Sequence, residues 1–157
     1  MGNNRIQKLD SEGNLLTEWG TLGSEDGQFN EPRGVAVDSS GNVYVSERRN
    51  NRVQKFDSEG KFLMKWGTES SGQLILAEGL AVDTSGNVYV ADSYKGDCIQ
   101  KFDSVGNFLT KWGTEGEGDG QFWGKSYLYF SCNKAESEPS IACICSWLIL
   151  LSLWASP

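Results

Sequence analysis

Residues 27–68 read GQFNEPRGVAVDSSGNVYVSERRNNRVQKFDSEGKFLMKWGT, and this stretch decides the fold. Inside it, four short runs rich in β-branched and aromatic residues alternate with turn residues, at 34–37, 42–45, 52–56 and 61–66. Such runs are typical of β-strands. The links at 38–41 and 57–60 each begin with Asp and end with Gly, which tolerates a positive φ. We therefore predict four antiparallel strands, the first two and the last two joined as tight hairpins.

The same pattern returns on both sides of this stretch at a nearly fixed interval. NNRVQKFDSEGKFLMKWGT at 50–68 is matched by NNRIQKLDSEGNLLTEWGT at 3–21 and by IQKFDSVGNFLTKWGT at 99–114. GVAVDSSGNVYVSE at 34–47 is matched by GLAVDTSGNVYVAD at 79–92. A period of this length indicates a repeat architecture. A four-stranded unit this small buries its apolar side chains only by stacking on its neighbours, as the blades of a propeller do.

The repeated pattern GQFxxPxGVAVDxxGNVYVxExxNNRVQKF resembles the NHL-repeat family of β-propellers. The resemblance implies an all-β fold, a partial β-propeller of four-stranded antiparallel blades with about two and a half repeats. We place a partial blade at 5–19 and full blades at 34–67 and 79–113, within a propeller segment at 1–124. Residues 125–157 are expected to form an irregular apolar tail outside the fold, although residues 127–131 take the place of GVAVD and are compatible with one more strand.

Propellers of this kind need about four to eight blades to close their ring. Two and a half blades leave three alternatives: a fragment of a longer propeller protein, an assembly of several copies, or an open stack with exposed sheet edges. We favour the fragment. Closing the ring would need either the missing blades or self-association.

The composition excludes most catalytic chemistry. The chain has 157 residues, a formal charge of −7 and no histidine. Ser–His and Cys–His nucleophile pairs and the common zinc sites all need histidine. We therefore predict a chain that is not an enzyme and that has no catalytic residues, no metal site and no cofactor. Segments of the form D-x-x-G, at 10–14, 38–42, 57–61, 83–87 and 103–107, are interpreted as hairpin turns, since they lack the alternating ligands and closing Glu of a calcium loop.

Neither a targeting segment nor a membrane span is evident in the sequence. The N-terminus has no charged segment followed by an apolar one, so we expect the cytoplasm rather than secretion. The apolar run at 141–154 is shorter than the roughly 17–25 residues that a spanning helix needs, which makes membrane attachment an unfavoured interpretation.

The blade topology predicts where binding takes place. In an up-and-down blade, the first and third turns lie on one face of the propeller, so the second turn and the blade-to-blade connections share the other. We call these the short-turn face and the long-loop face. Variable loops on a rigid scaffold are the usual place for binding. The candidate binding residues on the long-loop face are Arg33, Arg48, Arg49, Arg52, Tyr94 and Lys95.

Carboxylates on the same connections bear on the kind of partner. They are Glu25, Asp26, Glu31, Glu69, Glu78, Glu115, Glu117 and Asp119. Their charge repels phosphates, whereas protein recognition tolerates mixed charge. We therefore predict a non-catalytic scaffold for protein–protein binding. RNA binding through the basic loop at 48–52 and an inactive fragment of a longer propeller remain alternatives. The resemblance further implies substrate recognition of the kind found in NHL-containing ubiquitin ligases.

Overall fold

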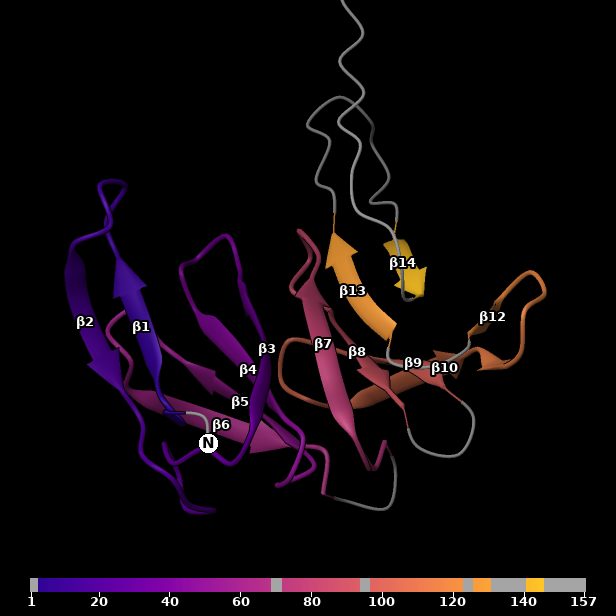
Figure 1. Ribbon diagram of the computed structural model, residues 1–157, viewed down its shortest axis with the longest axis horizontal. Helices are drawn as coiled ribbons and strands as arrows, with labels where there is room; N and C mark the ends of the chain where they lie inside the picture. Colours follow the sequence, from indigo (N-terminus) through magenta and orange to yellow (C-terminus); the bar gives the residue numbers. More distant parts are fainter. Residues whose placement is uncertain (1–2, 69–71, 94–96, 123–125, 131–140, 146–157) are drawn as a thin grey trace, which may run out of the picture.

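The computed structural model describes residues 3–68, 72–93, 97–122, 126–130 and 141–145, and these form sheets without a helix (Figure 1). A two-stranded sheet, the half-blade, contains β1 (Ile6–Leu9) and β2 (Leu15–Trp19). Blade 1 contains β3 (Pro32–Val37), β4 (Val43–Glu47), β5 (Arg52–Phe56) and β6 (Phe62–Trp66). Blade 2 contains β7 (Ala77–Val82), β8 (Val88–Asp92), β9 (Cys98–Phe102) and β10 (Phe108–Trp112). Two further pairs are β11 (Thr114–Glu115) with β12 (Gln121–Phe122), and β13 (Ser126–Phe130) with β14 (Ile141–Cys145).

The predicted all-β fold with four-stranded antiparallel blades is confirmed. In both full blades the strands pair in chain order, each antiparallel to the next. The observed strand ends differ from the predicted ones by one or two residues, chiefly at Pro32 and Glu47, which extend the first hairpin of blade 1 toward the long-loop face. Each blade-forming segment therefore adopts the structure that its alternating pattern predicts.

The blades stack face to face, and the apolar core lies between them. The central cluster joins blade 1 to blade 2 through Tyr44, Trp66, Leu80, Phe102 and other buried side chains. A second cluster lies between the half-blade and blade 1, and a third lies on the far side of blade 2. Because the central cluster is shared between the two full blades and the second one between the half-blade and blade 1, the blades are stabilised by packing on their neighbours, as the sequence predicts for a repeat of this size.

The first strands of the blades lie side by side near the centre of the array, where β3 contacts β7 and β7 contacts β13 (Figure 1). Their backbones come close at Gly34, where an added Cβ would stand 2.8 Å from the amide nitrogen of Leu80. The Ser46 hydroxyl accepts the Gly34 amide and donates to the carbonyl of Glu78. Glycine thus allows the two inner strands to meet, because any side chain at Gly34 would collide with backbone atoms.

The Asp-initiated turns join strands within each blade. In the β3–β4 turn, one carboxylate oxygen of Asp38 accepts the amides of Ser40 and Asn42, and the other accepts Asn42 Nδ2 and the Tyr44 hydroxyl. Burial alone would raise the pKa of Asp38, but these hydrogen bonds lower it below its usual value. The same bonds recur at Asp83. These carboxylates are occupied by their own turns, in agreement with the predicted turn role.

The structure describes two segments of the predicted tail, and both are extended. Residues 126–130 and 141–145 form the antiparallel pair β13–β14, with Ser126 opposite Cys145 and Phe130 opposite Ile141. Backbone pairing needs extended, β-prone residues rather than the repeat's own letters, and both segments provide them. The boundary at residue 124 stays a prediction. Within the described residues, no helix is long and apolar enough to cross a membrane.

Candidate functional site

A buried polar network fixes the loop that enters blade 1 on the long-loop face. Glu47, which is fully buried at the end of β4, accepts hydrogen bonds from Arg52 Nε at 2.6 Å and from Gln54 Nε2 at 2.8 Å. Its other oxygen accepts Asn50 Nδ2 at 2.6 Å and the amide of Asn30 at 2.9 Å. A buried carboxylate is tolerated only when it is paired and hydrogen-bonded, and here both conditions are met.

Arg52 connects this network to the loop above it. Its guanidinium donates to the carbonyls of Ser24, Glu25 and Gln28 at 2.6, 3.0 and 2.9 Å. Gln54 donates to the same Gln28 carbonyl at 2.8 Å. The loop before β3 is therefore tied down by side chains of β5, and the surface above it is built on a rigid base.

Blade 2 keeps part of this arrangement and loses its ion pair. Asp92 takes the place of Glu47 and accepts the amides of Ile75 and Leu76 at 3.1 and 2.9 Å, together with Gln100 Nε2 at 3.0 Å. Cys98 takes the place of Arg52, and burial, followed by the charge of Asp92, raises the pKa of its thiol. The same loop position is thus fixed in blade 2 by hydrogen bonds from uncharged donors to the Asp92 carboxylate, and in blade 1 by a buried ion pair.

A second group of charges lies on the outside of this base, where blade 1 meets blade 2. Arg48 Nε lies 3.0 Å from Glu78 Oε1, and its NH1 lies 3.6 Å from Glu31 Oε2. Arg33 contacts the same two carboxylates, at 3.3 Å from Glu31 and 3.8 Å from Glu78. Arg49 Nε reaches Glu31 Oε1 at 3.0 Å. We call these five residues the charge cluster.

The side chains of the charge cluster differ in their exposure to solvent, from a buried side to an exposed one. The side chain of Glu78 is 5% exposed, that of Arg48 25% and that of Arg49 63%. The Arg48–Glu78 pair is an ion pair in which the facing atoms Nε and Oε1 make no hydrogen bond. The arginines that reach solvent are therefore held by carboxylates beneath and beside them.

Glu31 is central to the charge cluster. Its φ of 52° lies in the left-handed region, which is uncommon for a residue other than glycine. Its carbonyl accepts the amide of Arg48, and its own amide donates to Asn4 Oδ1 at 3.2 Å. The hydrogen bond from Arg49 lowers the pKa of Glu31, so this carboxylate is charged at neutral pH. Strained backbone of this kind is concentrated at functional sites.

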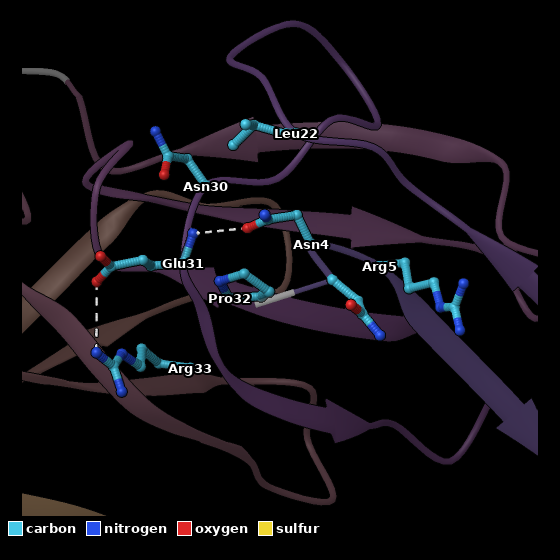
Figure 2. A pocket seen from close by; sticks show the side chains of 8 residues that line it. Asn4, Arg5, Leu22, Asn30, Glu31, Pro32 and Arg33 are labelled. Carbon is cyan, nitrogen blue, oxygen red and sulfur yellow. Dashed lines mark hydrogen bonds and ion pairs between the residues drawn. The ribbon is translucent and has the colours of Figure 1, made fainter. Parts of the chain in front are cut away.

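A hollow of about 570 Å³ opens beside Glu31 (Figure 2). It lies between the N-terminal segment at 3–5 and the entry to β3, and Figure 2 shows Glu31 linked on one side to Asn4 and on the other to Arg33. Its lining residues are Asn3, Asn4, Arg5, Leu22, Asn30, Glu31, Pro32 and Arg33. Six of its eight lining residues carry amide or charged side chains, whereas Leu22 and Pro32 add apolar surface, so the hollow presents both polar and apolar groups to a partner.

Metal ligation has no geometric support in the part of the chain that the structure describes. No group of three or more His, Cys, Asp and Glu residues is positioned there to hold a metal ion. The turns that begin at Asp10, Asp38, Asp83 and Asp103 use both carboxylate oxygens within the turn. In the Asp57 turn, Oδ1 accepts the amides of Glu59 and Lys61.

Comparison with known proteins identifies the repeat. The NHL repeat family matches residues 29–56 and 71–102. The chain contains NHL repeats. No curated protein matches it. A crystal structure of a protein of unknown function from Bacteroides caccae superposes with a TM-score of 0.56 at 16% sequence identity, covering 90% of this chain and 54% of that one. The chain thus spans about half the length of that structure, and the likeness shows the fold alone.

NHL repeats commonly form non-catalytic scaffolds for protein–protein interaction. Of the candidate binding residues in these repeats, Arg33, Arg48 and Arg49 come together in the charge cluster. Arg52 does not join them, because it is 3% exposed and fixed beneath the loop. Tyr94 and Lys95 lie outside the described residues.

The pairing of the charges in the NHL repeats was not predicted from the sequence. Glu31 and Glu78 are counted there only as carboxylates that repel phosphate, whereas each contacts two or more arginines. Arg33 and Glu78 stand at the same position of successive repeats, immediately before Gly34 and Gly79. Opposite charges at equivalent positions of adjacent blades are a signal from which the contact between them can be predicted.

Proposed function

We propose that the chain is a non-catalytic scaffold that binds a protein segment on its long-loop face, at the charge cluster. The observation that carries this proposal is the pairing of three arginines, Arg33, Arg48 and Arg49, with two carboxylates, Glu31 and Glu78, which compensates most of their charge. Such a surface exposes hydrogen-bond donors without a strong electrostatic potential of one sign. Mixed charge of this kind favours specific recognition of a polypeptide that carries both signs.

Preorganisation supports the same proposal. The loop beneath the charge cluster is fixed by the Glu47–Arg52 network, so a partner meets a surface that is already ordered. Binding to such a surface costs less conformational entropy than binding to a mobile loop. The exposed end of the cluster, Arg49, is the donor that is most accessible to a partner carboxylate or carbonyl.

RNA binding through residues 48–52 is the weaker alternative. A phosphate-binding surface needs uncompensated basic groups. In this loop, Arg52 is buried against Glu47, and Arg48 and Arg49 contact carboxylates at 3.0–3.6 Å. Substrate recognition within a ubiquitin ligase stays a prediction from the family resemblance, and it is one form of the protein binding proposed here.

A peptide display selection against the whole chain tests the proposal, followed by affinity measurements on one selected peptide. Arg49→Glu should weaken that peptide by at least about tenfold, as expected for an arginine anchor. Lys61→Glu is the matched control, because it reverses an exposed charge on the short-turn face and should leave the affinity unchanged.

Titration with a mixed-sequence single-stranded RNA, at two salt concentrations, tests the alternative. Tight, steeply salt-dependent RNA binding that Arg49→Glu abolishes would reverse the ranking. Selected peptides that bind Arg49→Glu as well as the unmodified chain would place the binding surface elsewhere.

A further inference from the structure

Arg49 is the arginine of the charge cluster whose charge is least compensated. Three arginines share two carboxylates there, so one positive charge is left over. The other two arginines each contact both carboxylates, whereas Arg49 contacts only Glu31. The uncompensated charge of the cluster therefore lies at its exposed end.

The guanidinium of Arg49 is oriented by one hydrogen bond and is otherwise open. Its Nε donates to Glu31 Oε1 at 3.0 Å, which fixes the direction of the group. Within the described residues its two terminal nitrogens have no acceptor, and the side chain is 63% exposed. These nitrogens form a planar fork that matches the two oxygens of a carboxylate. Arg49 thus presents an oriented site for two parallel hydrogen bonds.

The backbone around Arg49 is held on both sides. The Arg49 amide donates to the carbonyl of Asn30 at 3.3 Å, and the amide of the preceding residue donates to that of Glu31 at 3.1 Å. On the other side, Asn50 Nδ2 donates to the carbonyl of Gly23 at 2.9 Å. A ligand therefore meets a guanidinium whose position is largely fixed, which lowers the entropic cost of binding it.

We propose that the segment bound on the long-loop face presents one carboxylate to Arg49, whose two terminal nitrogens donate to its two oxygens. This inference rests on the proposed function and specifies the partner, a peptide segment that places an acidic residue on the charge cluster. A single negative charge compensates the positive charge that the cluster leaves over. A neutral carbonyl would not compensate it, and hydrogen bonds to an ionised group are roughly twice as strong as neutral ones.

A phosphorylated segment is the competing partner. A phosphate group carries about −1.5 to −2 charges at pH 7, which is more than the cluster has left to compensate. The excess would lie beside Glu31, which is charged at neutral pH because the hydrogen bond from Arg49 lowers its pKa. The cluster therefore suits an acidic side chain better than a phosphate.

NMR titration of the whole chain with capped tripeptides tests this inference without a selected partner. The probes are Gly-Asp-Gly, Gly-Asn-Gly and Gly-phosphoserine-Gly, each acetylated and amidated so that only the central side chain can carry charge. The aspartate probe should shift the Nε–H resonance of Arg49 with saturation at millimolar concentration. The asparagine probe should leave this resonance unchanged, and the phosphoserine probe should bind no tighter than the aspartate probe.

Two variants control the titration. With Arg49→Gln, the aspartate probe should no longer shift the backbone amide at position 49. Lys61→Gln makes the same kind of change at an exposed position of the short-turn face, and it should leave the response of Arg49 unchanged.

The selected peptide tests the same contact in a complete partner. Each of its acidic residues is replaced in turn by the corresponding amide. One replacement should weaken binding to the unmodified chain by at least about tenfold, as expected when a charge-assisted pair is lost. The same replacement should change binding to Arg49→Gln by less than about twofold, because the donor is already absent. Arg49→Lys should retain only part of the affinity, since lysine keeps the charge without the fork.

Equal shifts from the aspartate and asparagine probes, or tighter binding of the phosphoserine probe, would overturn the inference. A selected peptide that needs Arg49 but loses no affinity on any amide replacement would also overturn it, and the proposed function would then stand. A peptide that binds Arg49→Glu as well as the unmodified chain would instead contradict the proposed function. In that case the tripeptide titration would still decide whether Arg49 is a carboxylate site.

Discussion

Replacing Glu47 by glutamine should destabilise the chain strongly. The side chain is fully buried and accepts from Arg52, Gln54, Asn50 and the amide of Asn30. Glutamine keeps the size but replaces one acceptor oxygen by an NH₂ group, and it leaves the buried guanidinium of Arg52 without a counter-charge. Removing one partner of a buried ion pair costs about 3–5 kcal/mol.

The bonds of Arg52 to three loop carbonyls partly compensate its charge, so we expect a loss near the lower end of that range. A domain stability of about 5–15 kcal/mol then leaves Glu47→Gln folded but with a much lower urea midpoint. Glu59→Gln, an exposed turn position of blade 1, is the control and should change the unfolding free energy by less than about 0.5 kcal/mol.

A double-mutant cycle separates the pair from the rest of the network. Arg52→Met alone leaves Glu47 buried without its cation, whereas Glu47→Gln with Arg52→Met removes both charges. The double variant should therefore lose clearly less stability than the two single variants added together, with a coupling of about 1–3 kcal/mol. A loss below about 1 kcal/mol for Glu47→Gln, or strict additivity in the cycle, would show that the buried Glu47–Arg52 pair does not stabilise the fold in this way.

Other consequences of the structure can be measured on the same chain. Gly20→Ala should lower the melting temperature more than Gly27→Ala. Both glycines have a positive φ, but only at Gly20 would the added Cβ lie 2.3 Å from the Phe29 ring. Equal losses would contradict this packing role of Gly20. The pKa values of Asp38 and Asp83 lie below their usual value of 3.8, because hydrogen bonds to the carboxylates outweigh the effect of burial. The stability that these carboxylates contribute is therefore fully present above pH 3.8 and is lost as the pH falls through their lower pKa values in the folded chain. Changing both to Asn should flatten this acid dependence of urea unfolding, and an unchanged profile would contradict it. Calcium at millimolar concentration should leave the melting temperature of the chain unchanged, and a rise would point to a site that the turns do not account for.

Much of the fold was predictable because the sequence pattern of each strand and turn occurs in more than one copy of the repeat. Period-two alternation gives the strands, and Asp followed by Gly gives the turns, as at Asp38 and Gly41. A strand near β13 was compatible with the sequence, but its pairing with β14 was not predicted, because these segments do not repeat the sequence of the first hairpin. Strand pairing through the backbone requires only β-prone residues, so it produces a weak pattern in the sequence.

The place of the charge cluster in the fold was predictable, but the ion pairs within it were not. Topology alone placed Arg48 and Arg49 on the long-loop face, because the order of turns in a blade fixes which loops share a face. The topology did not show that Arg52 is buried. An arginine at the end of a strand can be exposed to solvent or covered by a loop, and the sequence is the same in both cases. The difference arises from Glu47, whose buried carboxylate draws Arg52 under the loop.

Amide chemical-shift mapping of the chain with a selected peptide tests the central claim, that the long-loop face recognises a protein segment, most directly. We expect the largest shifts at residues 30–33, at 47–49 and at Glu78, around the charge cluster. Shifts concentrated in the Asp turns at 38–42, 57–61 and 83–87, on the short-turn face, would contradict it.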